Sequence, residues 1–303
     1  MKTNPYISSP MNYIGGKYKL LPQIIPLFPE NIGTFVDLFC GGCNVGINIK
    51  ADKIVLNDNL SYLIDLYKTF DEKSSDTILA FIKKRIRELN LSLTNKDGYL
   101  KLREIYNTER NPLDLFVLTA YSFNHQIRFN NSHQFNNPFG KDRSCFNPHM
   151  ERNLLDFLKV LKTKNVVFYS NNFDELDLTK LQSNDFVYAD PPYLITTGTY
   201  NDGKRGFTGW NETEEEKLLS ILKNLDEQNI KFALSNVIEH KGKENSILLD
   251  WIEKNHFIIN YLNKDYSNSN YHTINRDKTS TVEVLVTNYE NESYQENFQL
   301  KWA

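Results

Sequence analysis

A short apolar run that ends in an acid and two prolines places the strongest constraint on how this chain folds. Residues 185–193 read Asp-Phe-Val-Tyr-Ala-Asp-Pro-Pro-Tyr, and the apolar part is typical of a buried β-strand. A proline donates no backbone N–H and fixes φ, so neither proline can continue a central strand. The strand must stop at Asp190, and a stiff loop must follow at its carboxyl end, where open α/β sheets bind ligands.

The loop that begins at Asp190 offers three groups that suit a planar base with an exocyclic amino group. The Asp190 carboxylate and the Pro191 carbonyl, held in place by Pro192, can accept the two amino hydrogens. Tyr193 can stack on the ring of the base. The sequence therefore predicts a catalytic corner made of four consecutive residues, Asp190, Pro191, Pro192 and Tyr193.

Residues 34–46 form a second unit, an apolar strand followed by a glycine-rich turn. It is similar to a nucleotide-binding βα turn, although it is not a strict G-x-G-x-x-G. Asp37 lies at the strand end, where its carboxylate can meet a ligand amine. A further strand over 53–56 ends at Asn57 and Asp58, and an acid there is placed to bind ribose hydroxyls. Together these features predict a cofactor of the adenosine type.

Two weaker motifs lie close to this unit. Residues 11–20 place a glycine pair and Lys17 before an apolar segment, which suits close approach to a ligand and a charge for a carboxylate or phosphate. A turn before a helix is the more common meaning of that pattern. Cys40 and Cys43 form a C-x-x-C motif, but Cys145 is the third and last cysteine, so a tight loop of small side chains is favoured over a metal or redox site.

The middle of the chain has the apolar spacing of helices, predicted over 60–70, 77–91, 98–106 and 112–121. Residues 73–164 hold sixteen Lys/Arg against nine Asp/Glu, a net charge of +7, which leaves −10 for the remainder of a chain whose total is −3. This asymmetry suggests that the middle portion faces a polyanion. A solvated helical surface is the alternative.

The segment 121–145 is crowded with Asn, Phe, Arg and His. Ile127, Phe129, Phe135 and Phe139 alternate with polar residues, which suits two short strands or an extended loop. Asn can pair with adenine and Arg with guanine in the major groove, and exposed Phe can wedge between or stack on bases. An ordered Asn-rich loop is the alternative to a DNA-reading segment.

Strands and helices alternate on both sides of this helical part. Strands are predicted over 165–169, 231–236, 257–261 and 281–289, with helices in 151–164, 211–225 and 247–254, a pattern that favours an α/β fold. No apolar run approaches the ~20 residues that span a bilayer, and residues 1–10 lack a signal-peptide core. With three cysteines and no disulfide framework, we expect a cytoplasmic protein without a membrane segment.

Taken in order, these motifs resemble the Dam-like family of DNA adenine-N6 methyltransferases over nearly the whole chain. The order is similar to the group in which cofactor motifs come first, the recognition region lies in the middle and DPPY follows. The matching stretches are YIGGK (13–17), FVDLFCGG (35–42), LND (56–58), FNHQIRFN…FNNPFG (123–140), DPPY (190–193), SN (235–236) and TVEVLVTNY (281–289). DPPY after a strand, with the glycine turn upstream, is the specific part of this signal.

The resemblance implies an α/β fold, with a Rossmann-like methyltransferase sheet and an inserted helical DNA-recognition domain that carries a β-hairpin. We expect 1–60 and 160–303 to form the catalytic domain and 61–159 the target-recognition domain. The implied activity is transfer of a methyl group from S-adenosyl-L-methionine to N6 of a flipped-out adenine in double-stranded DNA, without a metal. It also implies a restriction-modification context and a possible cognate endonuclease for the same site. Cytosine-N4 methylation and a catalytically silent nucleic-acid-binding module are the alternatives.

Site residues follow from their positions in the matching motifs. The implied cofactor-binding residues are Tyr13, Lys17, Asp37, Phe39, Gly41, Asp58 and Asp190. The implied DNA-reading and wedging residues are Phe123, Asn124, Arg128, Asn130 and Asn137. Two departures from the family pattern are the Tyr at position 13, where Trp is common, and the cysteines in the glycine turn. The resemblance leans towards GATC or a related GA-containing target.

Overall fold

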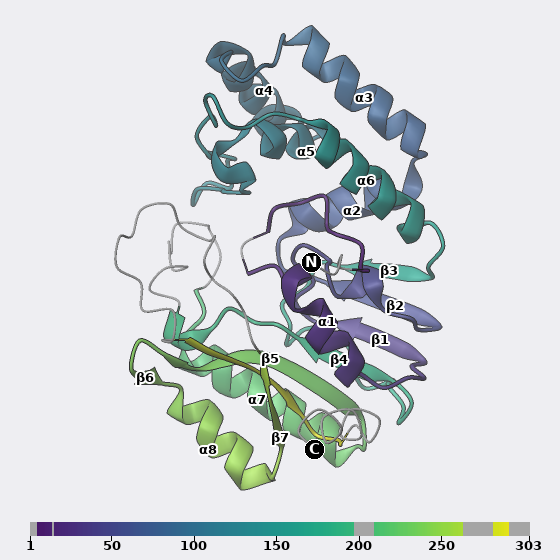
Figure 1. Ribbon diagram of the computed structural model, residues 1–303, viewed down its shortest axis with the longest axis vertical. Helices are drawn as coiled ribbons and strands as arrows, with labels where there is room; N and C mark the ends of the chain where they lie inside the picture. The colour runs from purple at the N-terminus through teal and green to yellow at the C-terminus, as the bar shows by residue number, and fades with distance from the viewer. Residues whose placement is uncertain (1–4, 14, 197–208, 263–280, 291–303) are drawn as a thin grey trace, which may run out of the picture.

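The computed structural model describes residues 5–13, 15–196, 209–262 and 281–290 (Figure 1). In these residues, the strands form one mixed sheet in the order β3-β2-β1-β4-β5-β8-β7, and β6 pairs with β5. The first five strands run parallel, whereas β8 is antiparallel to β5 and β7 to β8. The strands are β1 (Thr34–Asp37), β2 (Lys53–Asn57), β3 (Val166–Tyr169), β4 (Phe186–Ala189), β5 (Lys231–His240), β6 (Lys243–Glu244), β7 (Ile258–Leu262) and β8 (Thr281–Thr287).

The strand order reverses between β1 and β4. From β1 the sheet grows outwards through β2 and β3, and the chain then returns to the other side of β1 as β4. Asp37 ends β1 opposite Tyr188, and β4 ends at Ala189, directly before Asp190. Both acids therefore lie at the carboxyl edge of the sheet, at a switch point where neighbouring loops diverge and leave a crevice for a ligand. The predicted stop of the strand before the two prolines is confirmed.

Each face of the sheet is covered by a separate hydrophobic core. On one face lie α1 (Leu21–Ile24) with its flanking 3₁₀ turns and α2 (Ser61–Glu72). On the other lie α7 (Glu212–Glu227) and α8 (Ser246–Asn255). Side chains alternate along the strands. In β8, for example, Val284 and Val286 belong to the core beneath α7 and α8, and Leu285 belongs to the opposite core.

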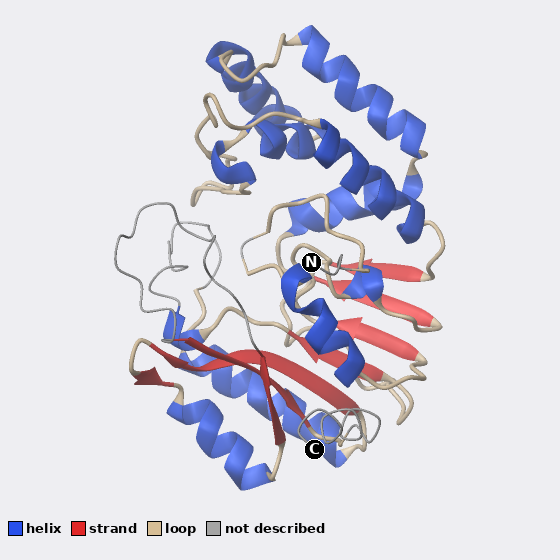
Figure 2. Cartoon of the chain, viewed as in Figure 1, coloured by secondary structure: helices blue, strands red, loops and turns tan. Residues whose placement is uncertain are grey.

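The chain between β2 and β3 is helical, as Figure 2 shows by the absence of red strands in its upper part. After α2 come α3 (Ser75–Glu88), α4 (Lys96–Glu109), α5 (Pro112–Tyr121) and α6 (Pro148–Leu161). Every residue of α5 after its first proline is buried, and α2, α3 and α4 pack around it. The core of these helices is continuous with the core on the α2 face of the sheet. The division between residues 61–159 and the rest stays a prediction.

The helix starts reflect local sequence signals. Side-chain oxygens accept from backbone N–H groups at the first turn of six of the described helices, which satisfies donors that have no partner inside the helix. These capping residues are Ser74, Asn95, Asn111, Asn147, Asn211 and Asn245. Within the described part of the chain, no helix is both long and apolar enough to span a membrane.

The segment between α5 and α6 differs from a regular β-hairpin. It has two isolated antiparallel bridges, Ser122–Phe139 and Phe129–Phe135, and no longer ladder. Asn124, His125 and His133 have positive φ, which interrupts strand pairing. Of the two predicted alternatives, the extended loop is correct, and the hairpin implied by the resemblance is irregular. We call residues 122–145 the recognition loop.

Candidate active site

A cavity of ≈ 280 Å³ opens at the carboxyl edge, where the loops after β1 and β4 diverge. The glycine turn after β1 and the Tyr13–Lys17 loop line one part of it. Residues 190–193 line another part, and Trp210 with the start of α7 lines a third. The proline corner and the glycine turn therefore border one cavity, although 150 residues separate them in the chain.

The glycine turn is held in a shape that only a small residue can adopt. Gly41 has φ of +43°, and a Cβ atom there would lie 2.9 Å from the ring of Tyr13. Its N–H donates to Asp58 Oδ2 at 2.9 Å, and its carbonyl accepts from the Tyr67 hydroxyl at 2.8 Å. Tyr13 thus packs directly over the turn, at the wall of the cavity.

Asp58 lines the cavity and also anchors the glycine turn. Besides Gly41, the N–H of Leu60 donates to it, at 2.9 Å to Oδ1. Burial raises the pKa of the Asp58 carboxyl, and these two backbone donors oppose the rise. Its role towards ribose hydroxyls stays a prediction, and the structure adds a role in holding the turn.

Asp37 is the most deeply buried of the acids that line the cavity. It is 1% exposed, and its Oδ1 atom has no hydrogen-bond partner among the described residues. Burial and the nearby Asp190 raise the pKa of Asp37 well above its usual range. A buried carboxylate oxygen without a donor is costly, so this atom fits a cationic group of a ligand, such as an ammonium.

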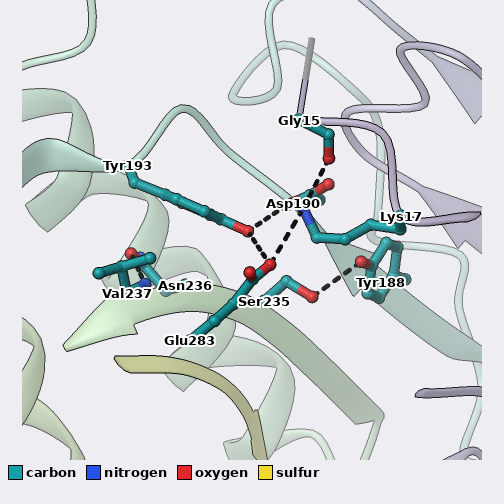
Figure 3. A network of polar contacts seen from close by, with 9 residues as sticks. All are labelled: Gly15, Lys17, Tyr188, Asp190, Tyr193, Ser235, Asn236, Val237 and Glu283. Atoms are coloured by element: carbon teal, nitrogen blue, oxygen red, sulfur yellow. Dashed lines mark hydrogen bonds and ion pairs between the residues drawn. The ribbon is translucent and has the colours of Figure 1, made fainter. Parts of the chain in front are cut away.

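A buried polar network occupies the proline corner (Figure 3). The Lys17 ammonium, on a residue 3% exposed, lies 2.7 Å from Asp190 Oδ1 and 3.7 Å from Glu283 Oε1. It also donates to the Gly15 carbonyl at 3.1 Å. The Tyr193 hydroxyl lies 3.1 Å from Asp190 Oδ1 and 3.1 Å from Glu283 Oε1. One ammonium and one hydroxyl are therefore shared between two carboxylates.

The ionisation of Asp190 is set by opposing influences. Burial raises its pKa most, and the adjacent Lys17 ammonium lowers it. The negative charge of Glu283 raises the pKa again, and the Tyr193 hydroxyl lowers it by donating to the carboxylate. Lys17 thus favours the charged form, which is the better hydrogen-bond acceptor.

Aromatic rings form the wall next to α7. The Trp210 ring packs edge-on against Phe39, with 5.7 Å between ring centroids, and at a tilt against Phe173, with 5.5 Å between centroids. Its indole N–H donates to the buried Glu215 at 2.6 Å. Glu215 also accepts from the side-chain amides of two asparagines, Asn236 at 2.9 Å and Asn245 at 3.1 Å. The Asn of the Ser235–Asn236 motif therefore acts at a distance, by supporting the residue that holds Trp210.

The recognition loop approaches the cavity at one point. Ile127 lines the cavity, and the side-chain amide of Asn12 donates to the Asn124 carbonyl at 2.8 Å. Phe123 is 38% exposed, with the Arg143 guanidinium 5.0 Å from its ring. Asn124 is also exposed, and Arg128 is half-buried.

Two of the predicted DNA-reading residues hold the loop itself. Asn137 is 3% exposed, and its amide nitrogen donates to the carbonyls of Phe123 at 3.0 Å and Gln126 at 2.8 Å. Its side chain therefore holds the backbone of the recognition loop, and a contact of Asn137 with DNA stays a prediction. Asn130 Oδ1 accepts from the N–H groups of Ser132 at 3.0 Å and Gln134 at 2.9 Å, so it closes a tight turn.

Two aromatic residues of the recognition loop belong to the hydrophobic core. Phe129 and Phe135 are buried and pack edge-on against each other at 5.7 Å, so they are core residues and cannot wedge between bases. The side chain of Asn107 in α4 pairs with the Phe135 backbone, accepting its N–H at 2.7 Å and donating to its carbonyl at 3.1 Å. These contacts fix the loop to the helical part.

Cys40 and Cys43 are buried free thiols in the glycine turn. Burial raises the pKa of the Cys40 thiol well above its usual range. Across the described ranges, no group of three or more His, Cys, Asp or Glu side chains is arranged to hold a metal ion.

The sequence did not identify several residues of the site: Asn12, Ile127, Phe173, Trp210, Glu215 and Glu283. For Glu283 a signal exists, because it is the only charged residue in the apolar stretch 281–287. A charge inside a buried strand needs a partner, and that requirement marks it as a candidate.

The chain is similar to known proteins over most of its length. The family model of the D12 class N6 adenine-specific DNA methyltransferases matches residues 13–279. Modification methylase StsI of Streptococcus sanguinis is 52% identical over 292 residues, and type II methyltransferase M.FokI of Planomicrobium okeanokoites is 50% identical over 290. Each match covers 96% of this chain and 44% of the relative, so the chain spans less than half the length of these proteins. The DNA adenine methylase of Escherichia coli K12 is 28% identical over 231 residues, 75% of this chain and 79% of the relative.

Proposed function

The chain belongs to the D12 class of N6 adenine-specific DNA methyltransferases, and on that premise we propose that it transfers a methyl group from S-adenosyl-L-methionine to N6 of an adenine in double-stranded DNA. One observation carries the proposal: the Asp190 corner and the glycine turn line the same cavity. An acceptor for an amino group and a site for an adenosine-type cofactor are thus within reach of each other.

The residues at the cavity fit S-adenosylmethionine, which supplies an electrophilic methyl group when bound. Asp37 Oδ1, buried and without a partner among the described residues, would accept from the ammonium of the cofactor. Four acids line the cavity, Asp37, Asp58, Asp190 and Glu214, against the two lysines Lys17 and Lys217, so the surroundings favour a cation. Phe39 and Trp210 offer apolar rings beside the cavity for an adenine ring.

The proline corner would act on the target amino group. Asp190 and the Pro191 carbonyl would accept the two amino hydrogens, which draws the nitrogen towards tetrahedral geometry and directs its lone pair outwards. Lys17, 2.7 Å from Asp190, favours the charged, accepting form of the carboxylate and opposes the rise in pKa that burial causes. Asp190 does not need to be a strong base, because the attacking amine is neutral. Positioning and charge stabilisation provide the rate enhancement.

The target base must leave the duplex to reach this corner, at a cost of about a few kcal/mol. Tyr193 would stack on the flipped base. The exposed side chains of Phe123 and Asn124, with Arg128 beside them, are the candidates to wedge into and read the DNA. The basic helical part would contact phosphates, which fix position and carry no sequence information.

A role in a restriction-modification system accompanies this activity. StsI is named a modification methylase and M.FokI a type II methyltransferase. By analogy, the chain would protect a DNA site that a cognate restriction endonuclease cleaves.

Methyl transfer from labelled S-adenosylmethionine to DNA tests the proposal directly. Wild type, Asp190→Ala and the matched surface variant Asp250→Ala are compared, and the DNA is digested to nucleosides. We expect label in N6-methyl-2′-deoxyadenosine for wild type and Asp250→Ala, and a loss of about 10²–10³-fold for Asp190→Ala. Equal activity of Asp190→Ala and wild type would reject the role of Asp190. Label in N4-methylcytosine would reassign the base, and tight cofactor binding without turnover on any DNA would favour a silent module.

A further inference from the structure

Glu283 is a buried acid for which the chemistry described so far has no role. It is 1% exposed and lies in β8 opposite Val237 of β5 and Leu262 of β7. Because β8 runs antiparallel to β5, the start of β8 lies beside the end of β5, at the carboxyl edge that carries the site. A charge buried in a sheet costs about several kcal/mol unless it is paired, so its partners indicate what it does.

Two partners of Glu283, Tyr193 and Lys17, are also partners of Asp190 (Figure 3). The Tyr193 hydroxyl is 3.1 Å from one oxygen of each acid, and the Lys17 ammonium is 2.7 Å from Asp190 and 3.7 Å from Glu283. A tyrosine hydroxyl has one hydrogen, so it can donate to only one of the two acids at a time. Tyr193 therefore competes with any incoming amino group for Asp190 Oδ1.

Glu283 resolves this competition, because it offers the hydroxyl a second acceptor at the same distance. We propose that Glu283 is a positioning residue for methyl transfer: it accepts a hydrogen bond from the Tyr193 hydroxyl while Asp190 accepts one from the amino group of the base. This inference rests on the proposed function. The Tyr193 ring then stays against the site with its hydroxyl satisfied, and the Asp190 carboxylate has one donor fewer.

Glu283 also affects the charge of Asp190. The titratable and charged groups that face Asp190 from the surrounding described elements are Lys17, Asp37, Tyr188, Tyr193 and Glu283. Of these, Glu283 raises the pKa of Asp190 by like-charge repulsion. Removal of its charge must lower the pKa of Asp190, so that the carboxylate stays ionised to lower pH.

The test is Glu283→Gln in the methyl-transfer assay over a range of pH. We expect kcat to fall roughly ten- to hundredfold, as for other losses of positioning, with little change in the KM for S-adenosylmethionine. The acid limb of the kcat profile should move to lower pH. The exposed Glu253→Gln in α8 removes the same charge far from the site and should match wild type in both respects.

Two further variants keep the inference testable if Glu283→Gln folds poorly. Glu283→Asp retains the charge and shortens the side chain, so kcat should fall while the acid limb stays in place. In a Tyr193→Phe background, Glu283 has no tyrosine hydroxyl from which to accept a hydrogen bond. Glu283→Gln should therefore lower kcat less in this background than in wild type. Equal losses in both backgrounds would overturn the inference.

The outcomes separate this inference from the proposed function. If wild type does not methylate DNA, the proposed function and the inference both fail. If wild type is active and Glu283→Gln has the same kcat and acid limb, the inference alone fails. It also fails if kcat falls only in proportion to the folded fraction, measured by circular dichroism, with the acid limb unmoved.

Discussion

The cavity at the sheet edge and the recognition loop use similar polar residues in different ways. Each residue that the sequence identified as catalytic or cofactor-binding lines the cavity: Tyr13, Lys17, Asp37, Phe39, Gly41, Asp58, Asp190, Pro191, Pro192 and Tyr193. The five predicted DNA-binding residues divide instead. Phe123 and Asn124 are exposed, Arg128 and Asn130 are half-buried, and Asn137 is buried.

The difference lies in what fixes the direction of a side chain. Parallel strands end at a common edge, so an acid that closes a strand must lie at that edge. In an irregular loop, the side-chain amide of an asparagine can form hydrogen bonds equally well with a base edge or with the backbone of the loop. Asn137 binds two backbone carbonyls, and nothing in its residue type distinguishes that role from DNA reading.

The largest effect at the cavity should come from Lys17→Met, which leaves Asp190 and Glu283 buried without their shared ammonium. We expect the free energy of unfolding to fall by about 3–5 kcal/mol, with loss of methyl transfer. Urea denaturation measures the first and the labelled assay the second. The exposed Lys19→Met is the matched control. If Lys17→Met leaves the free energy of unfolding unchanged, the Lys17 ammonium does not stabilise the two carboxylates.

Asp37→Asn tests the cofactor side of the cavity. We expect S-adenosylmethionine to bind about ten- to hundredfold more weakly, the scale of one charged hydrogen bond. Burial raises the pKa of Asp37 in the unliganded chain, and pairing with an ammonium requires the carboxylate. Wild-type affinity should therefore fall as the pH is lowered, starting at a higher pH than for an exposed aspartate.

Calorimetric titrations at several pH values measure this dependence. The Asp37→Asn variant cannot lose a proton there, so its affinity should not change with pH over the same range. A pH dependence that persists in Asp37→Asn would assign the titration to another group.

Asn137→Ala tests whether the Asn137 side chain holds the recognition loop or reads DNA. Its loss removes one donor from each of two backbone carbonyls, although the Ser122 hydroxyl still donates to one and the Gln126 N–H to the other. We therefore expect the free energy of unfolding to fall by roughly 1–2 kcal/mol. DNA binding should weaken alike for all sequences. An unchanged free energy of unfolding together with an altered sequence preference would indicate instead that Asn137 reads DNA.

Arg128→Ala should give the opposite pattern and the smallest change in stability. If Arg128 contacts a base edge, its loss costs about 1–3 kcal/mol of discrimination at one position of the site. The free energy of unfolding should stay within about 0.5 kcal/mol of wild type. Methylation of a library of DNA sequences, read by sequencing, measures the discrimination.

Most of the sheet and two of the three parts that line the cavity, the glycine turn and the proline corner, could be predicted from the sequence, because prolines, glycines and strand ends act locally. The end of the strand before Asp190 requires only the two prolines that follow it. The turn at Gly41 requires only a residue that readily adopts a positive φ, which glycine does. Glu283 could not be placed, since its position depends on how β8 pairs with β5. The support of Trp210 by Glu215 and Asn236 depends in the same way on contacts between distant segments.

The central claim is that the Asp190 corner presents an adenine amino group to a methyl donor held at the glycine turn. Sequencing of genomic DNA from cells that express the chain, with detection of modified bases, tests it most directly. We expect N6-methyladenine at one short, fixed sequence in cells with wild type and none in cells with Asp190→Ala. Modified cytosine, no modified base with wild type, or equal adenine methylation with both proteins would contradict the claim.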